Sequence, residues 1–446
     1  MKLHQTIRIA GKSLVMGRSS LKTTTINRIQ ASKTVSYVAY GAIASLHSAT
    51  RRLCVAVLAG ISAIACLDAG LALTASFTTT QLTNNSFDDI EPQISGLNAV
   101  WQGGDLGDAE IFFYNGKSTI QLTNNNEFDT VPQISGQNVV WSGTTGDPRF
   151  AEIFFYNGTT TRQLANNGLF NFAPQISGSK VVWSGSLSGA DDNEIFYNNG
   201  KTTTQLTNNN FDEFEPQISG SKVVWYGDDG NDLNIFLSDG KTTTQLSNNS
   251  LFNQSPQISG SNVVWNGYGI DSDDSEIFLY DGTTTTALTN NSLEDFLPQI
   301  SGSNVLWERF TLDPNSSSIF FYNGTKTIQL TNNSFEDTNA QISGNYATWQ
   351  GFDGNDTEIF FYDGTSTTQL TNNSFDDLNP QISGLNVVWS GSDGKDLEIF
   401  LATPTTAVPE PTSALGVLAF GAIGVGLRLL SKHKRHQVAN RVSTDV

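Results

Sequence analysis

Cysteine and histidine are scarce in this sequence and absent from most of it. The 446-residue chain has 2 cysteines and 4 histidines. Cys54 and Cys66 lie in an apolar stretch near the N-terminus. The histidines all lie before residue 76 or after residue 403: His4, His47, His433 and His436. The segment 76–403 is therefore predicted to contain no disulfide, no thiol nucleophile and no histidine-based catalytic triad.

Basic residues are also scarce between residues 76 and 403. The whole chain has 24 Lys and Arg, 43 Asp and Glu, and a formal net charge of −19. This segment holds 10 of the basic and 40 of the acidic residues, so its net charge is about −30. Such a surface repels phosphate, and we expect no nucleic-acid partner. Apolar residues make up 38% of the chain, which is enough for a sizeable core and excludes global disorder.

Tryptophan occurs at one position of a repeated ten-residue motif and nowhere else. The first copy runs from Pro92 to Trp101 and reads Pro-Gln-Ile-Ser-Gly-Leu-Asn-Ala-Val-Trp. Later copies follow at intervals of 40 or 42 residues, and each ends in one of the 8 tryptophans: Trp101, Trp141, Trp183, Trp225, Trp265, Trp307, Trp349 and Trp389. Repeats of this regularity indicate a repeat architecture.

Each repeat predicts four short antiparallel strands. In the first unit, residues 93–95 and 98–101 form two strands joined by a tight turn. Residues 110–114 are apolar on both faces, as in a strand buried on both sides. The hairpin pair Asn115-Gly116 leads into a fourth strand at residues 118–122. Four antiparallel strands in about 41 residues are typical of a propeller blade.

The two ends of the array complement each other. The eighth copy stops after its third strand, Glu398 to Leu401, while an extra strand at residues 78–82 precedes the first copy. Pairing these strands would complete the last blade and remove the open edges. We therefore predict an all-β fold, a closed eight-bladed β-propeller over residues 76–403 whose last blade is closed by the N-terminal strand. A seven-bladed ring with one aberrant unit is the alternative.

The repeats resemble those of TolB-type propellers. The resemblance covers about residues 76–403 and is carried in the fourth unit by these segments: Gln217 to Gly220, Val223 to Trp225, Asp229 to Asp232, Ile235-Phe236, Asp239-Gly240 and Gln245-Leu246. The units lack the Pro-Asp-Gly turn of that family. The resemblance implies the propeller fold more than a function, because propellers serve both as binding proteins and as enzymes.

Acidic residues concentrate on one predicted face of the ring. The distance from each Trp to the Ile of the third strand is 10 or 12 residues, so the loop between the second and third strands carries all the length variation. These loops and the links between blades emerge on the same face and hold 37 of the 40 acidic residues. Variable loops on one side of a repeat ring often form its binding surface.

Some of these acidic loops suggest a calcium site. Asp-rich loops in the fourth, seventh and eighth units offer the hard oxygen ligands that Ca²⁺ prefers. The candidate metal ligands are Asp228, Asp232, Asp353, Asp356, Asp393 and Asp396. None of these loops matches a full EF-hand. The alternative is that Asp, Asn and Gly occur there because tight turns require them.

No residue is nominated for catalysis, and we expect a protein that is not an enzyme. It would act as a binding or scaffold module for a surface polysaccharide or an envelope protein. The alternative is a secreted carbohydrate-active enzyme, a glycosidase or lyase, that uses two of the many carboxylates. Copy six is the one strong irregularity, because Glu308-Arg309 replaces the small residue and Gly that follow Trp in most copies. If the chain has a site that is not repeated, we expect it at these two residues.

The N-terminal segment, residues 1–75, has the features of a basic n-region and signal peptide. Arg51-Arg52 precedes an apolar run from Leu53 to Ala65, and small residues follow. This order predicts export, with cleavage just before the first repeat. A lipoprotein site at Cys66 and a retained membrane helix are the alternatives.

The C-terminal segment contains three ordered elements after residue 403. A linker at 404–411 ends in Val408, Pro409, Glu410 and Pro411; an apolar stretch at 412–430 follows, and then a basic tail at 431–446. The basic stop comprises Arg428, Lys432, Lys434 and Arg435.

This arrangement resembles the PEP-CTERM sorting signal. The resemblance implies an exosortase-type processing enzyme as partner and a propeller at the cell envelope, outer surface or outside the cell, anchored by a transmembrane helix before processing. A plain tail anchor is the alternative, because 412–430 is barely long enough to span a membrane. Both interpretations place the basic tail inside and the propeller outside.

Overall fold

A computed structural model of the protein describes residues 76–405, except 106–107, 148–149, 188–191, 231, 249–250, 270–273 and 312–315. The predicted signal segment, sorting motif, C-terminal helix and basic tail lie outside the described residues. Within the described part of the chain, no helix is long and apolar enough to cross a membrane.

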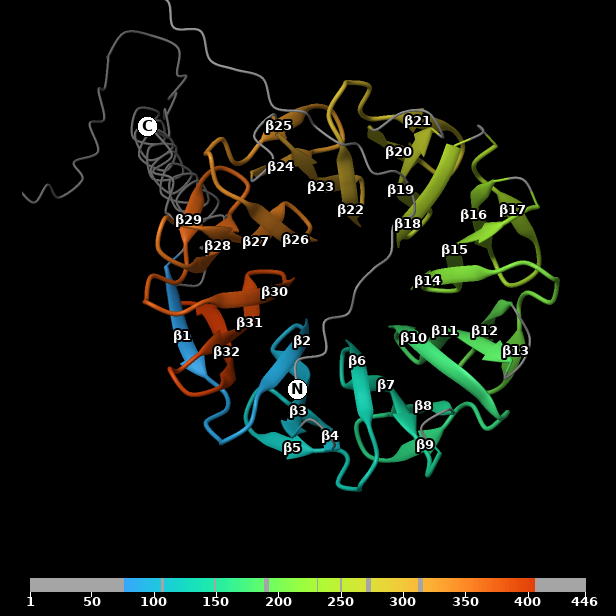
Figure 1. The fold of residues 1–446 in the computed structure, drawn as a ribbon, viewed down its shortest axis with the longest axis horizontal. Coiled ribbons are helices and arrows are strands. Elements are labelled where there is room, and N and C mark those ends of the chain that lie inside the picture. The colour runs from blue at the N-terminus through green and yellow to red at the C-terminus, as the bar shows by residue number, and fades with distance from the viewer. Residues whose placement is uncertain are drawn as a thin grey trace, which may run out of the picture. The chain divides into compact units, whose positions relative to one another are not determined.

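The described residues form 32 strands arranged as eight similar antiparallel sheets, here called blades 1 to 8 in chain order (Figure 1). The innermost strands are β2 (Asp89–Ser95), β6 (Asp129–Ser135), β10 (Leu169–Ser177), β14 (Glu213–Ser219), β18 (Leu251–Ser259), β22 (Asp295–Ser301), β26 (Asp337–Ser343) and β30 (Asp377–Ser383). The second strands are β3 (Asn98–Asp105), β7 (Asn138–Thr144), β11 (Lys180–Leu187), β15 (Lys222–Asp228), β19 (Asn262–Gly269), β23 (Asn304–Phe310), β27 (Tyr346–Phe352) and β31 (Asn386–Ser392).

The third strands are β4 (Asp108–Tyr114), β8 (Ala151–Tyr156), β12 (Asn193–Asn198), β16 (Leu233–Ser238), β20 (Ser275–Tyr280), β24 (Ser317–Tyr322), β28 (Thr357–Tyr362) and β32 (Leu397–Pro404). The outermost strands are β5 (Thr119–Gln121), β9 (Thr161–Gln163), β13 (Thr203–Gln205), β17 (Thr243–Gln245), β21 (Thr285–Ala287), β25 (Thr327–Gln329), β29 (Thr367–Gln369) and, for blade 8, β1 (Phe77–Gln81). A single parallel bridge between β8 and β10 links the sheets of blades 2 and 3.

The N-terminal strand completes the last blade, as predicted. β1 pairs antiparallel with β32 from Phe77 opposite Pro404 to Gln81 opposite Phe400 (Figure 1). A hydrogen bond from the turn glycine of one blade to a serine of the preceding blade joins neighbouring blades, and the same bond joins blade 1 to blade 8. Gly96 N donates to Ser383 Oγ at 2.8 Å, as Gly136 N donates to Ser95 Oγ at 2.9 Å. Eight sheets of one pattern, with the first packed on the last, are consistent with the predicted eight-bladed propeller.

The hydrophobic core lies between neighbouring blades, and an equivalent cluster of apolar side chains forms at each junction. Val100, Ile111 and Phe113 of blade 1 pack against Val139 and Trp141 of blade 2, for example. Each Trp also stacks on the phenylalanine opposite it in the third strand of its own blade, with ring centroids 5.8–6.1 Å apart. Such aromatic pairs add about 0.5–1.5 kcal/mol each beyond the area they bury. Every tryptophan is therefore a core residue.

The innermost strands begin about four residues earlier than the sequence predicts. β2 starts at Asp89 and contains Pro92, and its register shifts between Ile90 and Gln93. The residue before this proline, Glu91, has a φ of 52°, and the equivalent residue of every blade also has a positive φ. Proline is tolerated here because the strand is an edge strand and bulged at this point.

We predict that deleting residues 76–82 destabilises the propeller. The deletion leaves β32 without its partner, so backbone groups and apolar side chains of blade 8 become exposed. The melting temperature should fall by roughly 10 °C, or the protein should aggregate. Scanning calorimetry of the deletion variant checks this, and unchanged melting would contradict the ring closure.

Candidate functional site

The loops between second and third strands and the links between blades form one face of the propeller, here called the loop face. This face holds a repeated network of buried polar groups. In six of the eight blades the indole N–H of the Trp donates to the side chain 12 residues earlier. In blade 8, Trp389 Nε1 donates to Asp377 Oδ1 at 2.8 Å, and Asn373 Nδ2 donates to Asp377 Oδ2 at 2.6 Å. In blades 3 and 5 an amide replaces this carboxylate, as Asn171 and Asn253.

This network changes the interpretation of the acidic loop face. Twelve acidic residues of the described chain are buried: Asp89, Glu110, Asp129, Glu152, Glu194, Glu213, Asp295, Glu308, Asp337, Glu358, Asp377 and Glu398. The sequence indicates turn residues and solvent-exposed charge at these positions. The structure instead places them under the loop face, where they accept hydrogen bonds from indoles, amides and backbone N–H groups.

The glycine two residues after most tryptophans is explained by the same network. A Cβ on Gly391 would collide with Asp377 Oδ1, and Gly103 stands in the same relation to Asp89. The absence of a side chain lets the carboxylate lie across the backbone toward the indole. The glycine and the buried acid are therefore parts of one structural unit.

Blade 6 breaks this pattern at Glu308 and Arg309, the predicted location of a unique site. Arg309 donates to Asp295 from two of its guanidinium nitrogens, Nε to Oδ1 at 2.6 Å and Nη2 to Oδ2 at 3.0 Å. The guanidinium also lies 4.2 Å from the ring centroid of Phe320. Glu308 is buried and accepts a hydrogen bond from Ala340 N at 3.2 Å. Each of the two side chains thus has a hydrogen-bond partner of its own.

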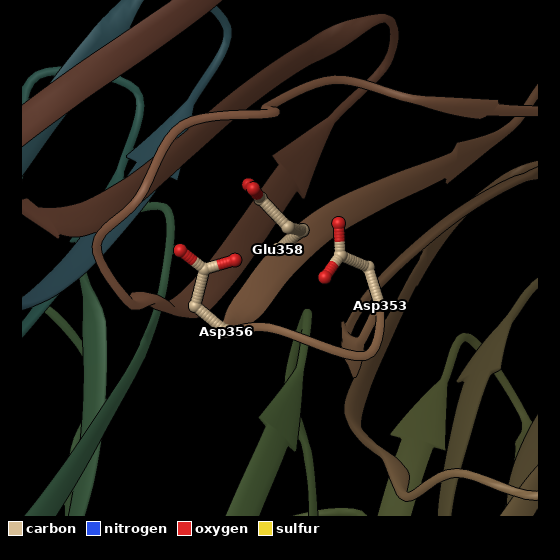
Figure 2. A group of neighbouring side chains, drawn as sticks. All are labelled: Asp353, Asp356 and Glu358. Atoms are coloured by element: carbon tan, nitrogen blue, oxygen red, sulfur yellow. The ribbon is translucent and has the colours of Figure 1, made fainter.

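The predicted metal ligands are partly brought together. Asp353 and Asp356 lie beside Glu358, with one oxygen from each within 4.8 Å of the others (Figure 2). Asp393 and Asp396 form the same group with Glu398 in blade 8. The sequence interpretation missed both glutamates because they lie two residues past the loop, inside strands β28 and β32.

Blade 4 has a different arrangement from the one predicted. Asp228 Oδ1 accepts the N–H of Gly230 at 2.6 Å, as in a tight turn. The residue at the position of Asp353 is Asp229, and Asn234 stands where blade 7 has Glu358. Asp228 and Asp232 therefore do not form a triad of carboxylates with a third acid in blade 4.

The loop face also carries exposed aromatic rings and a depression. Six phenylalanines near the loops and links are 38–44% exposed: Phe128, Phe170, Phe211, Phe310, Phe352 and Phe375. A depression of about 440 Å³ spans blades 8, 1 and 2, and its lining includes Phe87, Phe128, Asp88, Gln102 and Lys395. Apolar and hydrogen-bonding groups thus meet in one concave region, as in binding sites for organic ligands.

Comparison with known proteins bears on the fold. No protein-family model and no curated protein matches the chain. Among solved structures, a prolyl endopeptidase is similar with a TM-score of 0.51 at 10% identity, over 72% of this chain and 55% of that chain. The β-propeller domain of the trilobed protease from Pyrococcus furiosus has a TM-score of 0.49 at 12% identity, over 65% of this chain and 99% of that domain.

A putative TolB from Agrobacterium tumefaciens is also similar, with a TM-score of 0.33 at 17% identity over 48% of this chain and 88% of that one. The present chain spans about half the length of the prolyl endopeptidase. It has a β-propeller fold resembling peptidase propeller domains and TolB. At these identities the likeness concerns the fold alone.

Burial in blade 6 predicts a pH-dependent stability. Burial, with smaller contributions from the charges of Glu336 and Asp337, raises the pKa of Glu308 from 4.5 to about 7. A raised carboxyl pKa means that the folded state binds the proton more tightly than the unfolded state. The stabilisation is fully present below pH 4.5 and is lost as the pH rises through 7.

We therefore predict that Glu308→Gln stabilises the protein at pH 8 by on the order of 2 kcal/mol and has little effect at pH 4.5. Glutamine suits the position, since Gln350 occupies it in blade 7 and accepts a hydrogen bond from Asn379 N, the residue that corresponds to Asn339, at 2.8 Å. Urea unfolding at both pH values measures the difference. The reciprocal variant Gln350→Glu should lose stability at pH 8, and equal behaviour of both variants at the two pH values would contradict the assignment.

Proposed function

We propose that the protein is an exported binding or scaffold module whose loop face engages a surface polysaccharide. The observation that carries this proposal is the depression across blades 8, 1 and 2, bordered by Phe87 and Phe128. The flat rings of phenylalanine offer apolar contact to the C–H faces of sugar rings. Asp88 and Gln102 beside them offer acceptors and donors for sugar hydroxyls.

The repeat of these aromatic groups around the ring suits a polymer. A phenylalanine stands two residues before the buried acid in four links, as Phe87, Phe211, Phe335 and Phe375. A chain of repeating sugars can contact several equivalent positions at once, which raises affinity without a deep pocket. The excess of carboxylates favours a neutral or amino-sugar polymer over a polyanion.

Substitution of the aromatic rings tests the binding face. We expect Phe87→Ala and Phe128→Ala each to weaken polysaccharide binding by about 3- to 10-fold, because each removes one stacking contact. Leu97→Ala is the matched control, since Leu97 is 49% exposed in the turn between β2 and β3, on the opposite face. A glycan array followed by affinity measurements gives the comparison. Equal binding by all three variants would place the ligand elsewhere.

The same screen distinguishes the enzyme hypothesis. A glycosidase or lyase would release shorter products from a bound polysaccharide, whereas a binding module would leave the polymer intact. The buried carboxylates support a binding module. Those of the repeated network accept hydrogen bonds from indoles and backbone N–H groups, and so have a structural role. Release of reducing ends or unsaturated sugars would overturn the proposal.

We further propose that the protein is sorted to the cell envelope by its C-terminal segment. The support is the order of sequence elements after residue 403, with Pro409-Glu410-Pro411 directly before an apolar stretch and a basic stop. An exosortase-type enzyme would act at this motif, and the apolar stretch would anchor the protein in the membrane until then.

Processing is testable on protein from the native host. We expect the mature chain to end near Glu410, because cleavage at the motif removes the apolar stretch and the basic tail. Intact-mass spectrometry gives the C-terminal position. Chains that still end at Val446 would support the plain tail anchor instead.

A further inference from the structure

Neighbouring blades 7 and 8 hold matching groups of three carboxylates, here called the blade 7 triad and the blade 8 triad. The blade 7 triad is Asp353, Asp356 and Glu358, gathered between the loop and the start of β28 (Figure 2). The loop is closed by a hydrogen bond from Asp353 N to Asp356 O at 3.1 Å. Asp356 and Glu358 are two residues apart in extended chain and so point to the same side. The blade 8 triad, Asp393, Asp396 and Glu398, repeats this arrangement.

Both triad glutamates have a buried carboxylate oxygen without a hydrogen-bond partner among the described residues. Glu358 and Glu398 are 0% exposed. One oxygen of each accepts a backbone N–H, from Asn373 at 2.9 Å and from Asn85 at 2.8 Å. The other oxygen, Oε2, is buried without a hydrogen-bond partner among the described residues, as is Oδ1 of Asp356 and of Asp396. Burying a carboxylate oxygen without a donor is costly unless a cation neutralises it.

Nearby side chains add negative charge to the blade 7 triad. Asp376 bonds Thr357 N at 2.9 Å, and its charge, after burial and the charge of Asp353, raises the pKa of Asp356. Burial likewise raises the pKa of Glu358. No ion pair within the described residues joins a basic side chain to this triad.

The blade 8 triad has one weak basic neighbour. Lys395 Nζ lies 3.9 Å from Asp393 Oδ2, and the lysine side chain is 77% exposed. An exposed pair at this distance contributes little. It also leaves the buried oxygens of Asp396 and Glu398 unpaired.

Blade 4 shows how the same loop is satisfied without a cation. Asn234 replaces the glutamate, and its Nδ2 donates to Asp229 Oδ2 at 2.9 Å and to Asp232 O at 3.3 Å. Gln245 Nε2 reaches the same Asp229 oxygen at 3.3 Å. An amide thus supplies the donors that the triads of blades 7 and 8 lack.

We propose that each triad binds one Ca²⁺ ion. Three carboxylates in a short loop provide hard oxygen ligands, and backbone carbonyls and water can complete the six to eight ligands that Ca²⁺ takes. Mg²⁺ fits less well because it requires near-octahedral geometry and keeps its water. This inference is independent of the polysaccharide proposal, since it rests on the triads alone.

The blade 8 ion would also strengthen ring closure. Glu398 bonds Asn85 of the link that follows β1, and Asp88 of the same link accepts Leu397 N at 2.9 Å. An ion held by Asp396 and Glu398 would therefore fix the glutamate that bonds the start of blade 1. Calcium should tighten the junction where the two ends of the ring meet.

Equilibrium dialysis of the full-length protein against radioactive Ca²⁺ tests the proposal. We expect saturable binding with dissociation constants of about 10⁻⁴–10⁻³ M, as in extracellular calcium modules. Glu358→Gln and Glu398→Gln should each remove one bound ion per chain, and the double variant should lose two. Asp229→Asn in blade 4 is the matched control and should leave the number of ions unchanged. Equal uptake by the double variant and the wild type would overturn the proposal.

Thermal melting provides a second readout and a control for folding. Ca²⁺ should raise the melting temperature of the wild type more than NaCl of equal ionic strength, by mass action on the folded state. The double variant should melt normally in EDTA and lose the Ca²⁺-specific increase. If it fails to fold, Asp356→Asn with Asp396→Asn, which alters loop residues, serves in its place. A wild-type protein that responds alike to Ca²⁺ and to matched NaCl would contradict calcium binding.

Discussion

The buried indole N–H of each repeat's tryptophan needs an acceptor, and much of the loop face is organised to supply it. The tryptophans of all eight blades are at most 2% exposed, so water cannot serve. In six blades the acceptor is the acid or amide 12 residues earlier. In blade 8 an asparagine four residues before this acid bonds its other oxygen. That asparagine's backbone N–H bonds the glutamate of the preceding blade, as Asn125 bonds Glu110 at 2.6 Å. One polar requirement thereby links neighbouring blades wherever the third strand carries this glutamate.

Blades that depart from this unit show which of its parts can be exchanged. Asparagine can replace the acid, as Asn171 does, because the indole needs only an oxygen. Arg309 can replace the glycine because its guanidinium donates hydrogen bonds to the carboxylate of Asp295. A side chain without a donor would displace that carboxylate. The third-strand glutamate is also exchanged, for Asn234 in blade 4 and for Ser318 in blade 6. Where Asn234 takes its place, the neighbouring loop aspartate gains an amide donor, and the local charge falls.

The same packing determines which groups the loop face presents. The opposite turns are short and repeat closely, whereas the loops beside the buried acids vary in length and carry the exposed phenylalanines. Carboxylates needed for the core therefore lie directly beneath a surface suited to a ligand. Where the network supplies enough donors they are structural. In blades 7 and 8 two loop aspartates lie beside a glutamate with an unpaired oxygen, and this is the arrangement that we propose as a cation site.

The sequence alone predicts the repeat length, the number of strands and the pairing of the first strand with the last blade. Each of these depends on local pattern and on the order of segments along the chain. The tight turns at Asn-Gly and Asp-Gly follow from the same pattern. Tertiary structure decided the rest. Pro92 lies inside a strand because that strand is a bulged edge. Asp377 is buried because an indole 12 residues away needs it. Glu358 joins Asp353 because a hairpin folds the chain back across positions that no local periodicity connects. An aspartate that accepts a hydrogen bond from an indole and an aspartate that faces solvent are the same residue type. Only the tertiary packing around each distinguishes them.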